Sequence, residues 1–125
     1  MSLLLDTHIL LWWLADDPRL WQTARNRIAD PTERVLISAA TVWEIGIKQA
    51  IGKLEAPESI LSAIQEGGFE ELPISARHAE LAARLPEHHK DPFDRMLIAQ
   101  AQVEGLTLVT ADSAIEAYDL VILKA

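Results

Sequence analysis

The sequence predicts an α/β fold with three layers, in which a mainly parallel central sheet of about five strands is flanked by helices. Short continuous apolar runs, such as Leu3 to Leu5 and Val35 to Ile37, are typical of strands buried on both faces. Longer segments with helical periodicity separate these runs. Strands that alternate with helices favour parallel pairing with right-handed crossovers. The 125 residues suit one core, so we predict a single domain over residues 1–125.

The predicted elements follow one another without a linker, an internal repeat or a low-complexity tract. The predicted helix starts are placed by N-cap residues, which are Asp17, Ser38, Ser75 and Asp91. Two helix ends are placed by glycines, which are Gly52 and Gly105. Proline at the first helical position supports the helices at 18 and 92. Helices are predicted over residues 7–14, 18–29, 39–51, 57–65, 76–85, 92–104 and 113–117. Strands are predicted over residues 3–5, 35–37, 69–74, 106–109 and 120–123.

The composition excludes several classes of protein. Without cysteine the chain has no disulfide framework and no thiolate metal site. The apolar N-terminal run lacks a basic segment and is interrupted by Asp6 and His8, which argues against a signal peptide. No stretch of 18 apolar residues is present, so we predict a cytoplasmic protein with no membrane partner. The formal net charge of −8, taken alone, argues against binding to nucleic acid.

Three aspartates are expected at one edge of the sheet. Asp6 ends the first predicted strand, and Asp112 lies just past the strand over residues 106–109. Asp94 is in the first turn of a helix that starts at the same carboxyl edge, where open α/β sheets bind ligands. Glu44 lies further into its helix, about 9 Å along the axis at roughly 1.5 Å per residue. Its long side chain can reach back to this edge.

Four converging carboxylates repel one another unless a cation lies among them. Hard oxygen ligands suit Mg²⁺ or Mn²⁺, which also bind phosphate oxygens. Such ions can activate a water and stabilise the charge that develops on a phosphodiester. Two divalent ions would cancel four carboxylate charges where the phosphate sits, so the acidic balance no longer excludes nucleic acid. Four cations near these acids in the sequence could guide the phosphate backbone: Lys48, Lys53, Lys90 and Arg95.

Each acid also has a purely structural interpretation. Asp94 suits the first turn of a helix because an acid there interacts favourably with the helix dipole. Glu44 lies three residues after Thr41, a capping-box spacing, and four before Lys48, the spacing of a surface ion pair. Spacing alone favours the structural role for Glu44. Asp6 and Asp112 stand where helix N-caps are expected, and so does Asp91, a further acid at the start of the helix that carries Asp94.

Histidines and tryptophans give weaker signals. His88 and His89 are adjacent and should point in different directions, so we predict a solvated loop there and no metal site. His8 is near Asp6 and is either a supporting or a packed residue. The four tryptophans have apolar neighbours on predicted helices and are expected in the core or in a protein interface, and not as base-stacking surfaces: Trp12, Trp13, Trp21 and Trp43.

Four segments of the chain match a known family. They are residues 3–8, 37–45, 91–101 and 108–112, and the most specific is the Asp-Pro-Phe-Asp-Arg run that begins at Asp91. In order and spacing they resemble the PIN-domain ribonucleases and, within them, the VapC toxins of bacterial toxin–antitoxin pairs. The resemblance covers the chain almost from end to end and implies a PIN-like fold.

The resemblance implies a Mg²⁺- or Mn²⁺-dependent endoribonuclease that hydrolyses RNA phosphodiester bonds, as the toxin of a type II system that inhibits translation. It implies catalytic and metal-binding roles for Asp6, Glu44, Asp94 and Asp112, and so reverses the structural preference for Glu44. Supporting roles are implied for Asp91 and for the hydroxyls of Thr7, Ser38 and Thr110; Arg95, in the same run, is a further supporting candidate. The implied partners are an RNA substrate, a small VapB-like antitoxin and a second copy in a homodimer.

Other functions fit the sequence less well. A haloacid-dehalogenase-type phosphatase needs Asp-x-Asp after its first strand, and position 8 here is His8. A phospho-acceptor receiver domain needs an aspartate at the end of a central strand, where this chain has Ser38. A catalytically degenerate binding module remains as the alternative, and the complete set of acids argues against it.

Overall fold

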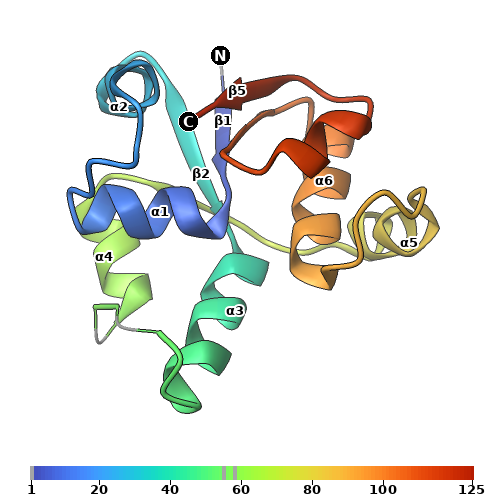
Figure 1. Ribbon diagram of the computed structural model, residues 1–125, viewed down its shortest axis with the longest axis horizontal. Coiled ribbons are helices and arrows are strands. Elements are labelled where there is room, and N and C mark those ends of the chain that lie inside the picture. Colours follow the sequence, from blue (N-terminus) through green and yellow to red (C-terminus); the bar gives the residue numbers. More distant parts are fainter. Residues whose placement is uncertain (1, 55, 58) are drawn as a thin grey trace.

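The computed structural model describes residues 2–54, 56–57 and 59–125. Within them lies a five-stranded sheet with the order β3-β2-β1-β4-β5, in which every neighbouring pair is parallel (Figure 1). The α/β fold predicted from the sequence is therefore confirmed. The strands are β1 (Ser2–Leu5), β2 (Arg34–Ser38), β3 (Glu70–Leu72), β4 (Thr107–Thr110) and β5 (Ile122–Lys124).

Two apolar cores lie on opposite faces of the sheet, because successive side chains of a strand point to opposite faces. Leu3 and Leu5 of β1 belong to one core, and Leu4 belongs to the other. The first core is covered by α1 (Thr7–Leu14), α2 (Gln22–Ala29) and α4 (Ile60–Glu66). The second is covered by α5 (Ala76–Arg84) and α6 (Pro92–Glu104) (Figure 1). Continuous apolar strands are needed because both faces are buried.

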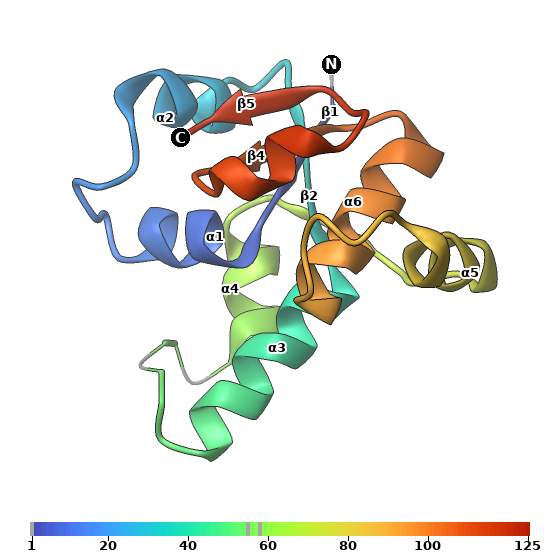
Figure 2. The same ribbon diagram turned by 45° about the vertical axis from the view of Figure 1, so that its right-hand side comes forward.

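The carboxyl edge of the sheet is where several helices begin. Figure 2 shows β1 leading into α1 and β2 leading into α3 (Ala39–Ala50), which extends away from the sheet. The predicted caps hold these starts: the Ser38 hydroxyl accepts a hydrogen bond from the backbone N–H of Ala40 at 3.0 Å. Gly105 ends α6 with a φ of 67°, a left-handed conformation that glycine adopts without steric strain.

The prediction that a helix begins at Pro18 was wrong. Asp17 caps a turn instead, in which its carboxylate accepts from the backbone N–H of Arg19 at 2.9 Å and pairs with the Arg19 guanidinium at 2.7 Å. Helix α2 starts four residues later, after Trp21, which makes no side-chain cap. The backbone N–H of Arg19 thus closes an aspartate turn that local spacing could not distinguish from a helix start.

Smaller differences concern ends of elements. The helix predicted over residues 57–65 begins at Ile60, where the Ser59 hydroxyl caps it; residue 58 lies outside the described residues. The strand predicted over 69–74 stops before Pro73, which has no N–H to donate to a neighbouring strand. No helix of the described residues is long and apolar enough to span a bilayer.

Candidate active site

Two aspartates follow adjacent strands at the carboxyl edge, and both cap the next helix. Asp6, after β1, accepts from the backbone N–H of Ile9 at 3.0 Å and is buried. Asp112, after β4, accepts from the backbone N–H of Ala114 at 2.9 Å and so caps the short helix η1 (Ser113–Ala117). The structural interpretation of these acids is correct, yet a cap uses one carboxylate oxygen and leaves the other for further contacts.

The N-terminus of α6 adds two more carboxylates to this edge. Asp91 is its N-cap and accepts from the backbone N–H groups of Phe93 at 2.8 Å and Asp94 at 3.1 Å. Burial and, after it, the negative charges of Asp91, Asp6 and Glu44 together raise the pKa of Asp94 to about 7. Asp94 therefore interacts electrostatically with Asp91 of its own helix start and with acids from two other parts of the chain, Asp6 after β1 and Glu44 on α3.

Burial also raises the pKa of Asp6, although a hydrogen bond from the Thr110 hydroxyl opposes this shift. The Asp112 charge acts on Asp6 in the same direction as burial. The three aspartates that the sequence predicts at one edge thus interact in the folded protein. Their ionised forms are unfavourable together in the absence of a cation.

Glu44 is 4% exposed and joins the same group of acids from α3. Its Oε1 accepts from the Thr7 hydroxyl at 2.6 Å, and its Oε2 pairs with the Lys48 ammonium at 2.5 Å. The ion pair with Lys48 was one of the structural interpretations, but a surface pair was expected and this carboxylate is buried. Thr41 does not cap the helix, because Ser38 does.

His89 lies inside the acidic group, so the prediction of a solvated loop was wrong for this residue. Its Nε2 is 2.9 Å from Asp94 Oδ2 and 2.9 Å from Asp112 Oδ2. The backbone N–H of His89 donates to the Tyr118 hydroxyl at 2.9 Å, which holds the loop in place. The available sequence signal was its position two residues before the Asp91 cap, at the edge where α6 begins. His88 packs edge-on against the Tyr118 ring instead.

Arg95 does not face the acidic group as a guide for phosphates. Its guanidinium donates to backbone carbonyl oxygens at 2.8–3.2 Å, and these belong to Ala82, Leu85, Pro86 and His89. The side chain therefore holds the segment that carries His89 against α6. The proposed role of Arg95 along a nucleic-acid backbone is replaced by this structural one.

The predicted hydroxyls divide into two groups. Thr7 donates to Glu44, and Thr110 contacts Asp6 while its Oγ1 accepts from the backbone N–H of Asp112 at 3.0 Å. The Ser38 hydroxyl instead caps α3 by accepting from the backbone N–H of Ala40. Two of the three hydroxyls thus orient carboxylates of the acidic group.

The chemistry of this site fits a divalent cation. Ligand atoms of His89, Asp94 and Asp112 lie within 4.8 Å of one another. The raised pKa values of Asp6 and Asp94 indicate carboxylates whose negative charge is incompletely compensated by the protein. Carboxylate oxygens are the preferred ligands of Mg²⁺, and a cation would favour their ionised forms.

Comparison with known families identifies the fold. A model of the PIN domain matches residues 3–120. The chain belongs to the PIN domain family. The resemblance noted in the sequence is thereby confirmed. This PIN domain is similar to ribonuclease VapC22 of Mycobacterium tuberculosis, with 27% identity over 120 residues that make up 94% of this chain and 92% of the relative.

Solved structures with the same fold include toxin–antitoxin complexes. VapBC2 from Rickettsia felis, bound to a DNA fragment from its promoter, matches this PIN domain with a TM-score of 0.75 and 18% identity, over 100% of this chain and 99% of that chain. DNA-bound VapBC from Salmonella typhimurium matches with a TM-score of 0.74 and 22% identity, over 99% and 98% of the two chains.

Proposed function

We propose that this PIN domain is a Mg²⁺- or Mn²⁺-dependent endoribonuclease and the toxin of a type II toxin–antitoxin pair. The observation that carries the proposal is the interaction of acids from β1, α3, α6 and β4 at one edge of the sheet: Asp6, Glu44, Asp94 and Asp112. The similarity to ribonuclease VapC22 supports RNA as the substrate.

The residues of the proposed site have different roles. Asp6, Glu44 and Asp94 would hold the metal. Asp112, whose ligand atom lies within 4.8 Å of those of His89 and Asp94, would complete a second ion site or position the attacking water. The bound ion supplies activation of the water and stabilisation of phosphate charge. The Thr7 hydroxyl and the Lys48 ammonium hold the Glu44 carboxylate, one on each oxygen.

Backbone caps hold the aspartates in a similar way. The carboxylates of Asp6, Asp91 and Asp112 each accept from a backbone N–H of a helix that starts at the sheet edge, which orients them. His89 bridges Asp94 and Asp112 through Nε2. Direct hydrolysis needs no protein nucleophile, which agrees with a site composed of carboxylates.

An exposed apolar stripe on α3 supports a protein partner. Trp43, Ile47 and Ile51 recur every four residues and are all exposed. Four-residue spacing puts these side chains on one face of the helix. The VapBC neighbours are complexes, so we propose a small VapB-like antitoxin and a second copy of this chain as the partners of such surfaces.

The test is cleavage of a fluorescent RNA by the purified protein with Mn²⁺, Mg²⁺ or EDTA. Asp94→Asn and Asp6→Asn should each lower the rate at least about 100-fold, because a carboxylate that binds the ion is lost. Asp119→Asn changes an exposed aspartate before β5, at the opposite edge of the sheet, and should cleave like the parent.

Circular dichroism before and after each substitution verifies the fold. Full activity of Asp6→Asn, or cleavage that persists in EDTA, would contradict the proposed site. Binding of RNA or antitoxin without any metal-dependent cleavage would favour the catalytically degenerate binding module.

A further inference from the structure

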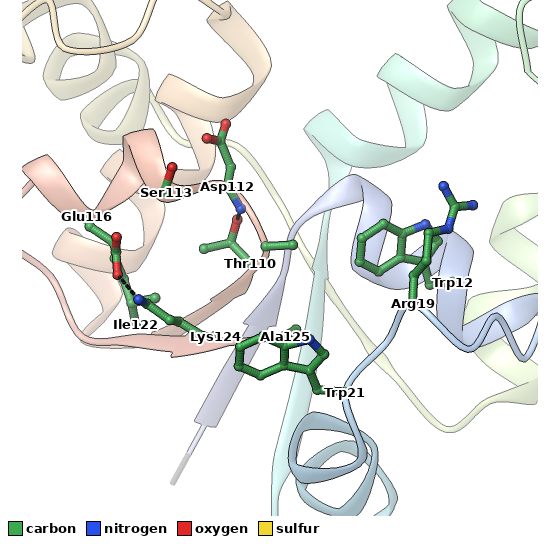
Figure 3. Close-up of a pocket in the computed structure, with 11 residues that line it drawn as sticks. Trp12, Arg19, Trp21, Thr110, Asp112, Ser113, Glu116, Ile122, Lys124 and Ala125 are labelled. Atoms are coloured by element: carbon green, nitrogen blue, oxygen red, sulfur yellow. Dashed lines mark hydrogen bonds and ion pairs between the residues drawn. The ribbon is translucent and has the colours of Figure 1, made fainter.

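A pocket of about 350 Å³ opens beside the acidic site (Figure 3). Asp112 lines it and also belongs to the acidic group, so a molecule in the pocket lies next to the proposed cleavage site. Thr110, Asp112 and Ser113 lie on one side, and Trp12 and Arg19 lie across from them (Figure 3). The volume is in the range of sites that bind small molecules.

Aromatic side chains line the pocket from two directions. Trp21, directly before α2, is 57% exposed, although burial of an indole is strongly favourable. The Arg19 guanidinium lies over the ring of Trp12 in α1, 5.1 Å from the ring centroid. Flat aromatic surfaces and stacked guanidinium groups are what proteins use to hold unstacked bases of single-stranded RNA.

Two cations line this pocket in a chain of net charge −8. Arg19 pairs with Asp17, and Lys124 pairs with Glu116, both at 2.7 Å. The side chains of Arg19 and Lys124 are 69% and 61% exposed. Exposed pairs contribute little stability, so either cation can turn to a phosphate without a large loss.

We propose that this pocket binds one nucleobase of single-stranded RNA beside the scissile phosphate. Trp21 is the stacking surface, and Arg19 and Lys124 contact the neighbouring phosphates. The exposed hydroxyl of Ser113 and the Asp112 carboxylate offer polar contacts to the base edge. The inference rests on the proposed ribonuclease function and deepens it, because it assigns a subsite for the substrate. For Trp21 it differs from the expectation that the tryptophans lie in the core or in a protein interface.

A measurement of RNA binding without cleavage tests this proposal separately from catalysis. A 5′-labelled ten-nucleotide single-stranded RNA is titrated with Asp94→Asn protein in EDTA, and its fluorescence anisotropy gives the dissociation constant. In that background Trp21→Ala should weaken binding about ten-fold, because one stacked base is lost. Trp21→Phe keeps a flat ring and should stay within about three-fold of the starting protein.

Val121→Ala is the control, since Val121 is an apolar side chain that is 62% exposed, lies directly before β5 and is outside the pocket. It should leave RNA binding unchanged. Lys124→Gln should reduce the slope of log affinity against log salt by about 0.7, as expected for one lost phosphate contact on a single strand.

Equal RNA affinity of Trp21→Ala and its starting protein overturns the subsite, and so does an equal loss in Val121→Ala. If Trp21→Ala binds RNA as tightly as its starting protein, a side chain of a protein partner becomes the alternative occupant of the pocket. Failure of the ribonuclease proposal is recognised separately, because it requires that the unsubstituted protein with Mn²⁺ leaves the same RNA intact.

Discussion

Asp94 is the side chain whose protonation the site changes most clearly. Burial and neighbouring carboxylates raise its pKa to about 7 from an ordinary value of 3.8, so the folded protein holds this proton more tightly than the unfolded chain. Between these two values the unfolded state loses the proton first. The contribution of Asp94 to the free energy of unfolding therefore falls as pH rises from about 4 to about 7, and the penalty is complete above that range.

Asp94→Asn should accordingly stabilise the metal-free protein at pH 8. The expected gain in the free energy of unfolding is on the order of 1–3 kcal/mol, because the repelled charge is absent. The gain should shrink towards pH 4, where the folded parent keeps this proton and the unfolded chain also holds it for part of the time. Thermal melting in EDTA at both pH values measures it, with Asp119→Asn as the control. A lower melting temperature for Asp94→Asn at pH 8 would contradict this account.

At the scale of elements, the start of α6 organises the site. Its N-cap, Asp91, and its first-turn acid, Asp94, belong to the helix itself. His89 belongs to the preceding loop and depends on two contacts for its position, the Tyr118 hydroxyl and the Arg95 guanidinium. Four carbonyl oxygens converge on that one guanidinium, which therefore joins the end of α5 and the loop to α6.

Arg95→Gln should lower the free energy of unfolding by about 2 kcal/mol, because carbonyl oxygens lose a charged donor. It should also slow RNA cleavage by releasing His89 from Asp94 and Asp112. Urea unfolding measures the first effect. Arg84→Gln serves as the control, since Arg84 makes an exposed pair with Glu80 at 3.6 Å and should change stability by less than about 0.5 kcal/mol. Identical unfolding of both variants would exclude the proposed role of Arg95.

At the scale of the whole molecule, the acidic site joins parts of the chain that are far apart in sequence. Its carboxylates follow β1 and β4 or lie on α3 and α6, and the unfolded chain cannot hold them together. An ion that binds there binds the folded state. Its binding free energy therefore adds to the stability of the entire domain.

Mn²⁺ at about 100 times its dissociation constant should raise the free energy of unfolding of the parent by about 2.7 kcal/mol. Asp6→Asn should show a smaller rise, and Asp119→Asn should match the parent. Melting curves across a Mn²⁺ titration measure these shifts without reference to RNA cleavage. A parent protein that melts at the same temperature with EDTA and with millimolar Mn²⁺ would count against the metal site.

Local chemistry in the sequence was enough for most of the fold. Apolar runs predict the strands because a doubly buried strand needs them, and Ser38, Ser75 and Asp91 start helices because their side chains reach the next free N–H groups. The parallel topology brings Asp6 and Asp112 to one edge once the strands are known. These inferences depend on interactions over a few residues and on the geometry of crossovers.

Only the tertiary structure decided where the longer side chains go. The His89 ring meets the carboxylate of Asp112, Glu44 meets the hydroxyl of Thr7, and Trp21 lines a pocket with Lys124. Arg95, expected at a phosphate, binds the backbone of the preceding helix and loop. A long side chain can reach several partners at similar free energy, and the choice among them depends on packing between distant elements, which local spacing does not encode.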